Sequence, residues 1–222
     1  MSSDTERPTS RSRQRSTVPE ALTRDAIADV ALRLMDEHGV DAVSMRRLAG
    51  ELGVSAQALY WHFPNRDTLL RAVVDHAAAE LRSVTLGRGS PRQRLERYLR
   101  ELRRHWKRHP SAITLGRQYF PTAAGDVHRQ GTELFEQLGF AGADAIERHR
   151  SLVWIVLGFV FVEHSVAASQ HHTPLDAQRS AYDVRLPGAE ADQPGHHLDI
   201  DRLFEDTLAI ALDGLVAALP VP

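Results

Sequence analysis

Residues 44–63 read SMRRLAGELGVSAQALYWHF, and this stretch predicts two short helices joined by a tight turn. Ser44 and Ser55 precede the two helices, where a serine side chain accepts a hydrogen bond from the first-turn backbone. Gly53 lies between them, and glycine commonly ends a helix. Apolar residues at helical spacing would hold the pair together: Leu48, Ala49, Leu52, Val54 and Leu59. The stretch is therefore a candidate helix-turn-helix.

The opposite side of the second helix carries polar and aromatic side chains, namely Ser55, Ala56, Gln57, Tyr60, Trp61 and His62. Such side chains on an exposed helix can meet base edges and phosphates in the DNA major groove. Arg46 and Arg47 at the start of the first helix, and Arg66 beyond the second, could neutralise flanking phosphates. The alternative is that Tyr60 or Trp61 belongs to the core of a small bundle. The whole pattern favours DNA binding.

Helical patterns continue on both sides of this pair. Thr23 is a suitable N-cap for a preceding helix and Gly39 a suitable end, while Asn65 can cap a following helix that reaches about residue 84. The N-terminal residues are rich in Ser, Thr, Arg and Pro, which predicts a disordered basic tail or an arm that contacts DNA. We divide the chain into a disordered basic tail (1–18), a helix-turn-helix domain (19–66), a connecting helix and linker (67–90) and a larger domain (91–222).

The larger domain also has a helical pattern, with helices expected at residues 91–108, 111–120, 126–138, 143–168 and 200–218. The apolar run LVWIVLGFVFV at residues 152–162 is rich in β-branched residues and could be a buried strand. No second strand of like strength is present to pair with it, so we predict a buried helix. The interval 171–198 is rich in Pro, Gly, His and Asp and predicts a long loop. The predicted fold class is all-α.

Composition limits the function classes. The 222 residues include no cysteine, which excludes a disulfide framework, a thiolate zinc site and a cysteine nucleophile. The net charge is −2, so binding to nucleic acid requires a local basic face. The longest apolar run falls short of the ~20 residues that span a bilayer, and the polar N-terminus differs from a secretory signal. We therefore expect no membrane partner and a cytoplasmic location.

Motifs for enzymes and metals are weak or missing. The sequence contains no GxSxG, GxGxxG or P-loop, so we predict no enzymatic activity and no cofactor. His105 and His109 are four residues apart and could share one helix face as metal ligands. With 12 histidines in the chain, a metal is not needed to explain this pair, and we predict no metal site. A small helical enzyme or a metal-binding sensor using His and Glu residues of the larger domain remains the alternative.

Residues 23–70 resemble the DNA-binding domain of the tetracycline-repressor (TetR) family. The resemblance is carried by VSAQALYWHFPNRDTLL at residues 54–70, and above all by LYWHF at residues 59–63 followed by Asn65 and a basic residue. The rest of the chain resembles the C-terminal domain of the tetracycline-repressor subgroup. There the similarity lies in Leu138-Gly139-Phe140 ahead of the long apolar helix, and in Glu163 at the polar end of that helix.

The resemblance implies base contacts for Arg46 and Gln57, and a phosphate contact for Arg66. Where the subgroup has a polar side chain, this chain has Ala56, so the operator need not be the tetracycline operator. Residue chemistry and resemblance together predict DNA contacts for Ser44, Met45, Arg46, Arg47, Ser55, Ala56, Gln57, Tyr60, Trp61, His62 and Arg66.

The larger domain is expected to bind a small-molecule effector. Its apolar helices could line a cavity, although plain core is the better interpretation for most of their aromatic residues. The resemblance places Glu163 near a drug-bound metal. The alternative is that Glu163 is a solvated charge at the end of the apolar helix. Candidate effector-binding residues are Trp106, Phe120, Trp154, Phe159 and Glu163. The subgroup has a metal-binding histidine just before a Leu-Gly pair; here Thr114 stands before that pair, so tetracycline is not expected to be the effector.

These observations predict a ligand-responsive transcriptional regulator, a repressor that binds a palindromic double-stranded DNA operator and is released by its effector. One short recognition helix covers too few base pairs to be selective, so a homodimer is expected to read two half-sites. The helices at 143–168 and 200–218 would pack against their mates in a four-helix interface. The loop at 171–198 is expected to close over the effector as a lid.

Overall fold

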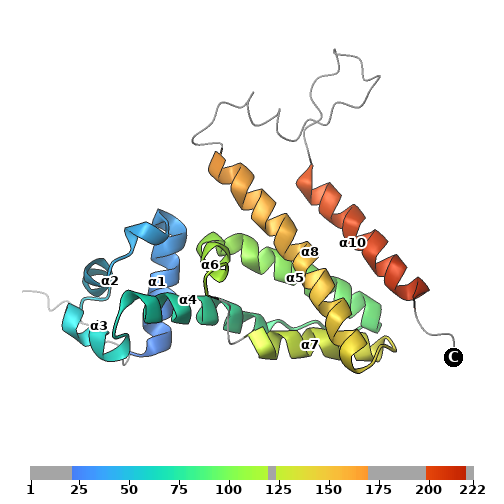
Figure 1. Cartoon of the computed structure of the whole chain (residues 1–222), viewed down its shortest axis with the longest axis horizontal. Coiled ribbons are helices and arrows are strands. Elements are labelled where there is room, and N and C mark those ends of the chain that lie inside the picture. Colours follow the sequence, from blue (N-terminus) through green and yellow to red (C-terminus); the bar gives the residue numbers. More distant parts are fainter. Residues whose placement is uncertain (1–21, 120–123, 170–198, 219–222) are drawn as a thin grey trace, which may run out of the picture.

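The computed structural model describes residues 22–119, 124–169 and 199–218 of the chain. Within those ranges all regular structure is helical (Figure 1), which confirms the predicted all-α class. The predicted basic tail, the long loop at 171–198 and Phe120 lie outside the described residues. Among the described helices, none combines the length and the apolar character that crossing a membrane requires.

The N-terminal part of the molecule consists of four helices: α1 (Arg24–His38), α2 (Met45–Glu51), α3 (Ala56–His62) and α4 (Arg66–Glu80). Two 3-10 turns flank them, η1 (Val40–Ala42) and η2 (Leu81–Ser83). The predicted N-caps are confirmed: Thr23, Ser44 and Ser55 accept backbone N–H bonds of 3.1–3.2 Å. Asn65 and Thr68 form a capping box at the start of α4. Each cap satisfies an otherwise unpaired backbone donor, which fixes where these helices begin.

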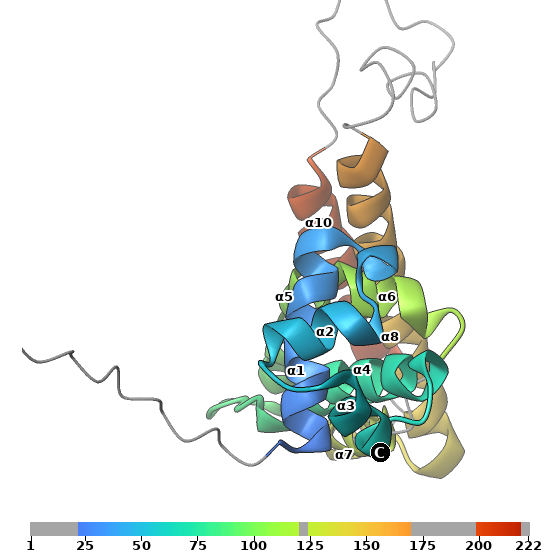
Figure 2. The ribbon, with the colours of Figure 1, turned by 90° about the vertical axis from the view of Figure 1, so that its left-hand side faces the viewer.

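The apolar side of α2 and α3 packs inward against α1 and α4. Ile27, Leu48 and Leu59, one from each of the first three helices, have no measurable exposure. Phe63, directly after α3, is equally buried. Because these residues fill one side of each short helix, the other side of α3 faces out at the end of the molecule farthest from α8 and α10 (Figure 2).

The C-terminal part also consists of helices: α5 (Pro91–Arg108), α6 (Pro110–Gly116), α7 (Ala124–Gln137), α8 (Gly142–Ser169) and α10 (Ile200–Ala217). The apolar run at 152–162 lies within α8, which confirms a helix rather than a strand. α6 ends four residues earlier than predicted, because after Gly116 the chain tightens into a turn in which the N–H of Gln118 donates to the Leu115 carbonyl at 2.9 Å. α8 and α10 run side by side in opposite directions (Figure 1).

α4 joins the two parts, since it packs on α1 and also on α6 and α7. Near its start, the Tyr119 hydroxyl donates a 2.7 Å hydrogen bond to Asp67, whose other oxygen accepts from Arg71 at 3.1 Å. The bond from Tyr119 lowers the pKa of Asp67, and the Arg71 contact adds to this effect. The segment after α6 is thereby tied to the helix that follows α3.

Candidate nucleic-acid interface

The turn between α2 and α3 depends on its glycine. Gly53 has a φ of +66°, in the left-handed region that side-chain-bearing residues rarely adopt. The N–H of Val54 donates to the Ala49 carbonyl at 3.0 Å and closes the turn. The direction in which α3 leaves α2 is therefore set by the backbone itself.

Arg24 on α1 fixes the far end of α3. Its guanidinium donates a hydrogen bond to the carbonyl of His62 and lies 4.2 Å from the ring centroid of Phe63, within cation–π range. The role of Arg24 was not apparent from the sequence, because only the folded chain brings residues 24 and 62 together. In the sequence, Arg24 is only a basic residue directly after an N-cap, and such residues are common on helices where they have no such role.

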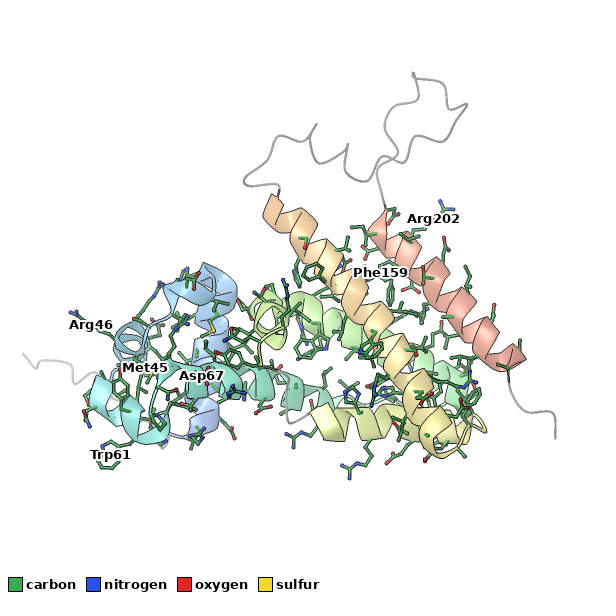
Figure 3. The ribbon with its side chains drawn as sticks, viewed as in Figure 1. Met45, Arg46, Trp61, Asp67, Phe159 and Arg202 are labelled. Carbon is green, nitrogen blue, oxygen red and sulfur yellow. The ribbon has the colours of Figure 1, made fainter. Side chains whose placement is uncertain are left out.

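The outer face of α3 is free of packing. Trp61 is 83% exposed and Tyr60 is 44% exposed, and the side chain of Gln57 is exposed as well. Figure 3 shows Trp61 pointing away from the domain. The alternative that Tyr60 or Trp61 belongs to the core is therefore wrong. A large indole held in water contributes little to folding, so this face is suited to contact a partner.

The side chains of α2 point in two directions, outward to solvent and inward to the core. Arg46 projects from the domain, whereas Met45 points inward and is only 7% exposed (Figure 3). The predicted DNA contact of Met45 is not supported, because its side chain is packed in the core and offers almost no surface. Arg47 is exposed and donates a hydrogen bond to the Ala42 carbonyl at 3.3 Å, which holds it beside the start of α2.

The remaining positions next to α3 have structural roles as well. The hydroxyls of Ser44 and Ser55 cap their helices, and both residues are exposed. Ala56 and His62 are half-buried at the two ends of α3. Their contacts with DNA stay predictions.

Arg66 is bound within the domain. Its Nε donates to the Val43 carbonyl at 3.2 Å and its Nη2 to the Val40 carbonyl at 2.8 Å, and the side chain is half-buried. These bonds tie the first turn of α4 to the segment between α1 and α2. Arginine has five N–H donors, so a phosphate contact remains a prediction, but removing Arg66 would also disturb the domain.

The aromatic candidates for effector binding do not converge on one cavity. Trp106 is buried and its ring meets that of His105 edge-on. Phe159 packs edge-on against Phe204 of α10, with ring centroids 5.3 Å apart. Trp154 is 63% exposed on the outside of α8. Its predicted place in an effector cavity is not supported, because its ring has solvent rather than other helices around it.

Glu163 belongs to a buried ion-pair network rather than to an open site. Arg103 on α5 bonds to Glu163 on α8 and, at 2.5 Å, to Asp201 on α10, and Lys107 lies 3.1 Å from Glu163. The side chain of Glu163 is only 11% exposed, so it is not a solvated charge at a helix end. The bond from Arg103 lowers the pKa of Asp201. This network ties three helices of the C-terminal part together.

An open groove of about 640 Å³ lies between α1 and α4. Its lining is mainly charged, unlike the apolar effector cavity that the sequence predicted: Arg24, Asp25, Ala72, Asp75, His76, Ala79, Glu80 and Arg82. It therefore gives no support to binding of an apolar molecule there.

A buried polar pair lies beneath α8. The Tyr98 hydroxyl is 3.1 Å from Nε2 of His149, and the missing side chain at Gly131 leaves room for the imidazole ring. Burial, with a smaller effect from nearby His128, lowers the pKa of His149 to about 4. Burial also raises the pKa of Tyr98. Near pH 7 the imidazole is therefore neutral, and its Nε2 shares a hydrogen bond with the Tyr98 hydroxyl.

The outward sides of α8 and α10 carry large apolar residues. On α8, Ile146, Trp154 and Phe161 recur at steps of eight and seven residues, and on α10 Leu203 and Ile210 recur at a step of seven, so these residues follow one side of each helix. Ile155 lies about 100° around α8 from Trp154. The exposed members are Ile146, Trp154, Ile155, Phe161, Leu203 and Ile210. A surface of this kind usually marks a protein–protein contact.

Comparisons with known proteins match both parts of the chain. A family model described as bacterial regulatory proteins, tetR family, matches residues 27–73. A second, described as tetracyclin repressor-like, C-terminal domain, matches residues 85–219. The tetracycline repressor protein class A from transposon 1721 of Escherichia coli is 30% identical over 210 residues, which is 87% of this chain and 90% of that protein.

Two solved structures share the whole arrangement. The Streptomyces coelicolor TetR family protein ActR, in complex with actinorhodin, superposes with a TM-score of 0.70 at 28% identity, over 91% of this chain and 100% of ActR. BioQ with its double-stranded DNA operator superposes with a TM-score of 0.61 at 26% identity, over 88% of this chain and 99% of BioQ.

Proposed function

The chain belongs to the TetR family of bacterial regulatory proteins, and from this premise we propose that it is a repressor that binds a palindromic operator as a homodimer and is released by a small-molecule effector. That it is a DNA-binding transcriptional regulator follows from the family. The observation that carries the finer proposal is the outer face of α3, where exposed Gln57, Tyr60 and Trp61 have no packing role. A regulator of this kind works in the cytoplasm, where the DNA is.

In this proposal α3 lies in the major groove. Gln57 and Arg46 read base edges, for which amide and guanidinium groups have suitable donors and acceptors. Tyr60, Trp61 and His62 press on the backbone or on thymine methyl groups. The other contacts go to phosphates or fix the approach of the helices: Ser44, Arg47, Ser55, Ala56 and Arg66. Met45 supports α2 from the core. BioQ, a structural neighbour, was solved with its operator bound, which supports this mode of binding.

The exposed apolar sides of α8 and α10 supply the dimer interface. Trp154 and Ile210 are 63% and 73% exposed in the single chain, and burying such side chains against a second copy yields about 25 cal/mol per Å² of apolar surface. Two pairs of antiparallel helices would form a four-helix bundle. A twofold dimer would then present two copies of α3 to two half-sites.

An effector bound in the C-terminal domain would act through α4. This helix contacts α1 on one side and α6 and α7 on the other, and Asp67 is tied to Tyr119 beyond α6. A ligand that favours one arrangement of these helices changes the spacing of the two recognition helices, and thus operator affinity. ActR, a structural neighbour, was solved with actinorhodin, which supports an organic effector.

Tetracycline is not the effector in this proposal. Thr114 stands before Leu115-Gly116, its side chain is exposed, and its hydroxyl donates to the Pro110 carbonyl at 3.0 Å. A hydroxyl already used in this way is a poor substitute for a metal-binding imidazole.

Selection of bound fragments from the source genome tests the DNA-binding role. We expect recovery of a site with two inverted half-sites about one helical turn apart or more. Fluorescence anisotropy with that site should then show one dimer bound per site at physiological salt, with much weaker binding to random DNA. Recovery of fragments without a shared sequence would contradict the proposal.

A further inference from the structure

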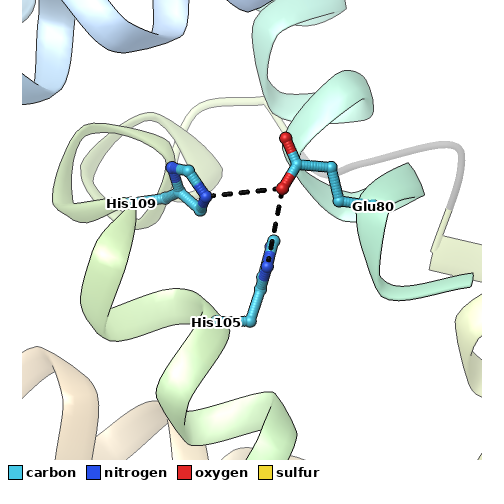
Figure 4. A group of neighbouring side chains, drawn as sticks. All are labelled: Glu80, His105 and His109. Carbon is cyan, nitrogen blue, oxygen red and sulfur yellow. Dashed lines mark ion pairs between the residues drawn. The ribbon is translucent and has the colours of Figure 1, made fainter. Parts of the chain in front are cut away.

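Glu80, His105 and His109 meet where α4 passes the end of α5 (Figure 4). The two histidines are four residues apart at the C-terminal end of α5, His105 in its last turn and His109 directly after it. Oε2 of Glu80 lies 3.9 Å from Nδ1 of His105 and 3.5 Å from Nε2 of His109. The three facing atoms all lie within 4.8 Å of one another.

The other nitrogen of each ring is already engaged. Nε2 of His105 donates to the Ala77 carbonyl at 2.8 Å, and a carbonyl can only accept. Nδ1 of His109 donates to the Asp36 carboxylate at 2.9 Å. In the neutral rings these bonds fix the tautomers, so that Nδ1 of His105 and Nε2 of His109 carry the lone pairs.

Three acceptors therefore face one another: two ring nitrogens and a carboxylate oxygen. At 3.5 and 3.9 Å with no hydrogen between them, these contacts are not hydrogen bonds. Lone pairs that point at one another repel, and the two rings have used their N–H groups elsewhere, so neither offers a hydrogen to relieve this repulsion. A cation bound between the three atoms would relieve it.

We propose that Glu80, His105 and His109 bind a divalent transition-metal ion, with Zn²⁺ as the best fit. Two imidazoles and one carboxylate form a common zinc ligand set, which leaves a fourth position for water. Ligands at about 2.1 Å from zinc lie about 3.4 Å apart in a tetrahedron, so the distances of 3.5 and 3.9 Å from the Glu80 oxygen to the two ring nitrogens need only a small closure. The chain has no cysteine, which disfavours Cu(I) and other ions that prefer thiolates.

The surroundings orient the ligands as in known zinc sites. A histidine ligand usually donates its second N–H to a carboxylate or a backbone carbonyl, which raises its basicity and fixes the ring. His109 does so to Asp36, and His105 does so to Ala77. The other oxygen of Asp36 accepts the Ser111 N–H at 3.1 Å, which holds that carboxylate in place. The ion would thus link α4, and through Asp36 also α1, to α5.

The test uses a tag-free chain in which His171, His172, His196 and His197, which lie outside the described residues, are replaced by Gln. Competition with a chromophoric chelator should show one Zn²⁺ per chain bound at micromolar concentration or tighter. Co²⁺ in the same chain should give the visible absorption of a tetrahedral site. Absence of saturable zinc binding, or of this cobalt spectrum, would overturn the proposal without the need for any further variant.

Variants in that background locate the ion. Glu80→Gln and His109→Gln keep the side-chain volume and should weaken zinc binding at least 100-fold, and zinc should no longer raise their melting temperature. Asp36→Asn should weaken it about 10–100-fold, as for other residues that orient a ligand. Unchanged zinc affinity in Glu80→Gln and His109→Gln would overturn the proposal.

His76→Gln is the matched control. Nε2 of His76 lies 3.7 Å from the other oxygen of Glu80 and 3.8 Å from Asp29. This variant should bind zinc as tightly as its parent. If His76→Gln loses the ion while His109→Gln keeps it, the ion belongs to Asp29, His76 and Glu80, and the assignment to His105 and His109 is wrong.

Discussion

Trp61 on α3 and Trp154 on α8 are both exposed, by 83% and 63%, but they stand on surfaces of different chemistry. Trp61 shares a short helix with Gln57 and follows Arg46 on α2. Trp154 shares a long helix with Ile155 and other exposed apolar residues, and Ile210 continues that surface on α10. Exposure alone therefore does not identify a partner. The mixed polar surface suits DNA, and the apolar one suits a second copy of the chain.

The two surfaces also differ in what lies beneath them. Under Trp61 the support is apolar, with Leu59 and Phe63 fully buried. The helix that carries Trp154 is tied to α5 and α10 by the buried charges of Arg103 and Glu163. Substitutions in the two regions should therefore have different effects. Changes on α3 should affect DNA binding, and changes around α8 should affect stability and assembly.

The largest effect is expected at the buried charge network. Glu163→Ala leaves Arg103 with only the exposed Asp201 and Lys107 with one carboxylate fewer, so the free energy of unfolding should fall by about 3–5 kcal/mol. Urea denaturation measures this change. The matched control is Glu205→Ala, which breaks the exposed pair with Arg100 and should cost less than about 1 kcal/mol. Equal losses in the two variants would show that burial does not set the strength of these pairs.

The apolar surface is tested by Trp154→Glu. A charge in the middle of the proposed interface should convert the dimer to a monomer at micromolar concentration, because a buried unpaired carboxylate is costly. Operator affinity should fall about 100-fold, or about 2.7 kcal/mol, since one recognition helix reads only half of the site. Light scattering and anisotropy measure the two effects. An unmodified chain that is already monomeric would refute the interface.

Because His149 is buried on the inner side of α8, the free energy of unfolding should depend on pH. His149 has a pKa of about 4 in the folded chain and an ordinary value of 6.5 when unfolded, so the unfolded chain binds more protons below pH 6.5. The stability linked to His149 is complete above pH 6.5 and is lost as the pH falls towards 4. Between pH 8 and pH 5 this loss is about 2 kcal/mol. In His149→Gln, denaturation at the two pH values should show a loss smaller by that amount; an identical loss would place the acid sensitivity elsewhere.

How much the sequence revealed depended on how far apart the interacting residues lie in the chain. Ser44, Gly53 and Ser55 act on their own backbone neighbourhood, so their spacing alone predicted the caps and the turn. The outward face of α3 followed from the same short stretch, because seven residues of one helix share a fixed geometry. Met45 was the exception there, since its inward direction depends on how α2 rests on the core.

The roles of the C-terminal residues depend on packing between distant helices, which one sequence does not reveal. Glu163 was recognised as a charge at the end of an apolar helix, but its partner Arg103 lies 60 residues away. Trp154 was a candidate for lining a cavity or for the core, because an apolar helix in sequence does not show which side meets a neighbour. His105 and His109 were visible as a pair, whereas Glu80 joins them only in the folded chain.

Base readout should produce a smaller effect that is confined to DNA. Gln57→Ala should weaken binding to the selected operator by about 1–3 kcal/mol and relax the preference at one base pair. Its unfolding free energy should stay the same, because Gln57 is exposed. Anisotropy with operator and random DNA measures both affinities. Equal losses on the two DNAs would mean that Gln57 contacts phosphate rather than a base.

The smallest effect, on stability, is expected at the most exposed tryptophan. Trp61→Ala removes a side chain that is 83% exposed, so the free energy of unfolding should change by no more than about 0.5 kcal/mol. Phe63→Ala, two residues further on, removes a fully buried ring and should cost about 3–5 kcal/mol. The contrast matters because both rings are large and aromatic and differ mainly in which way the chain turns them. If Trp61→Ala weakens operator binding and leaves the unfolding curve unchanged, the indole contacts DNA and does not stabilise the fold. If it destabilises the fold as strongly as Phe63→Ala, the indole packs against the protein, and the outer face of α3 is not free to enter a groove.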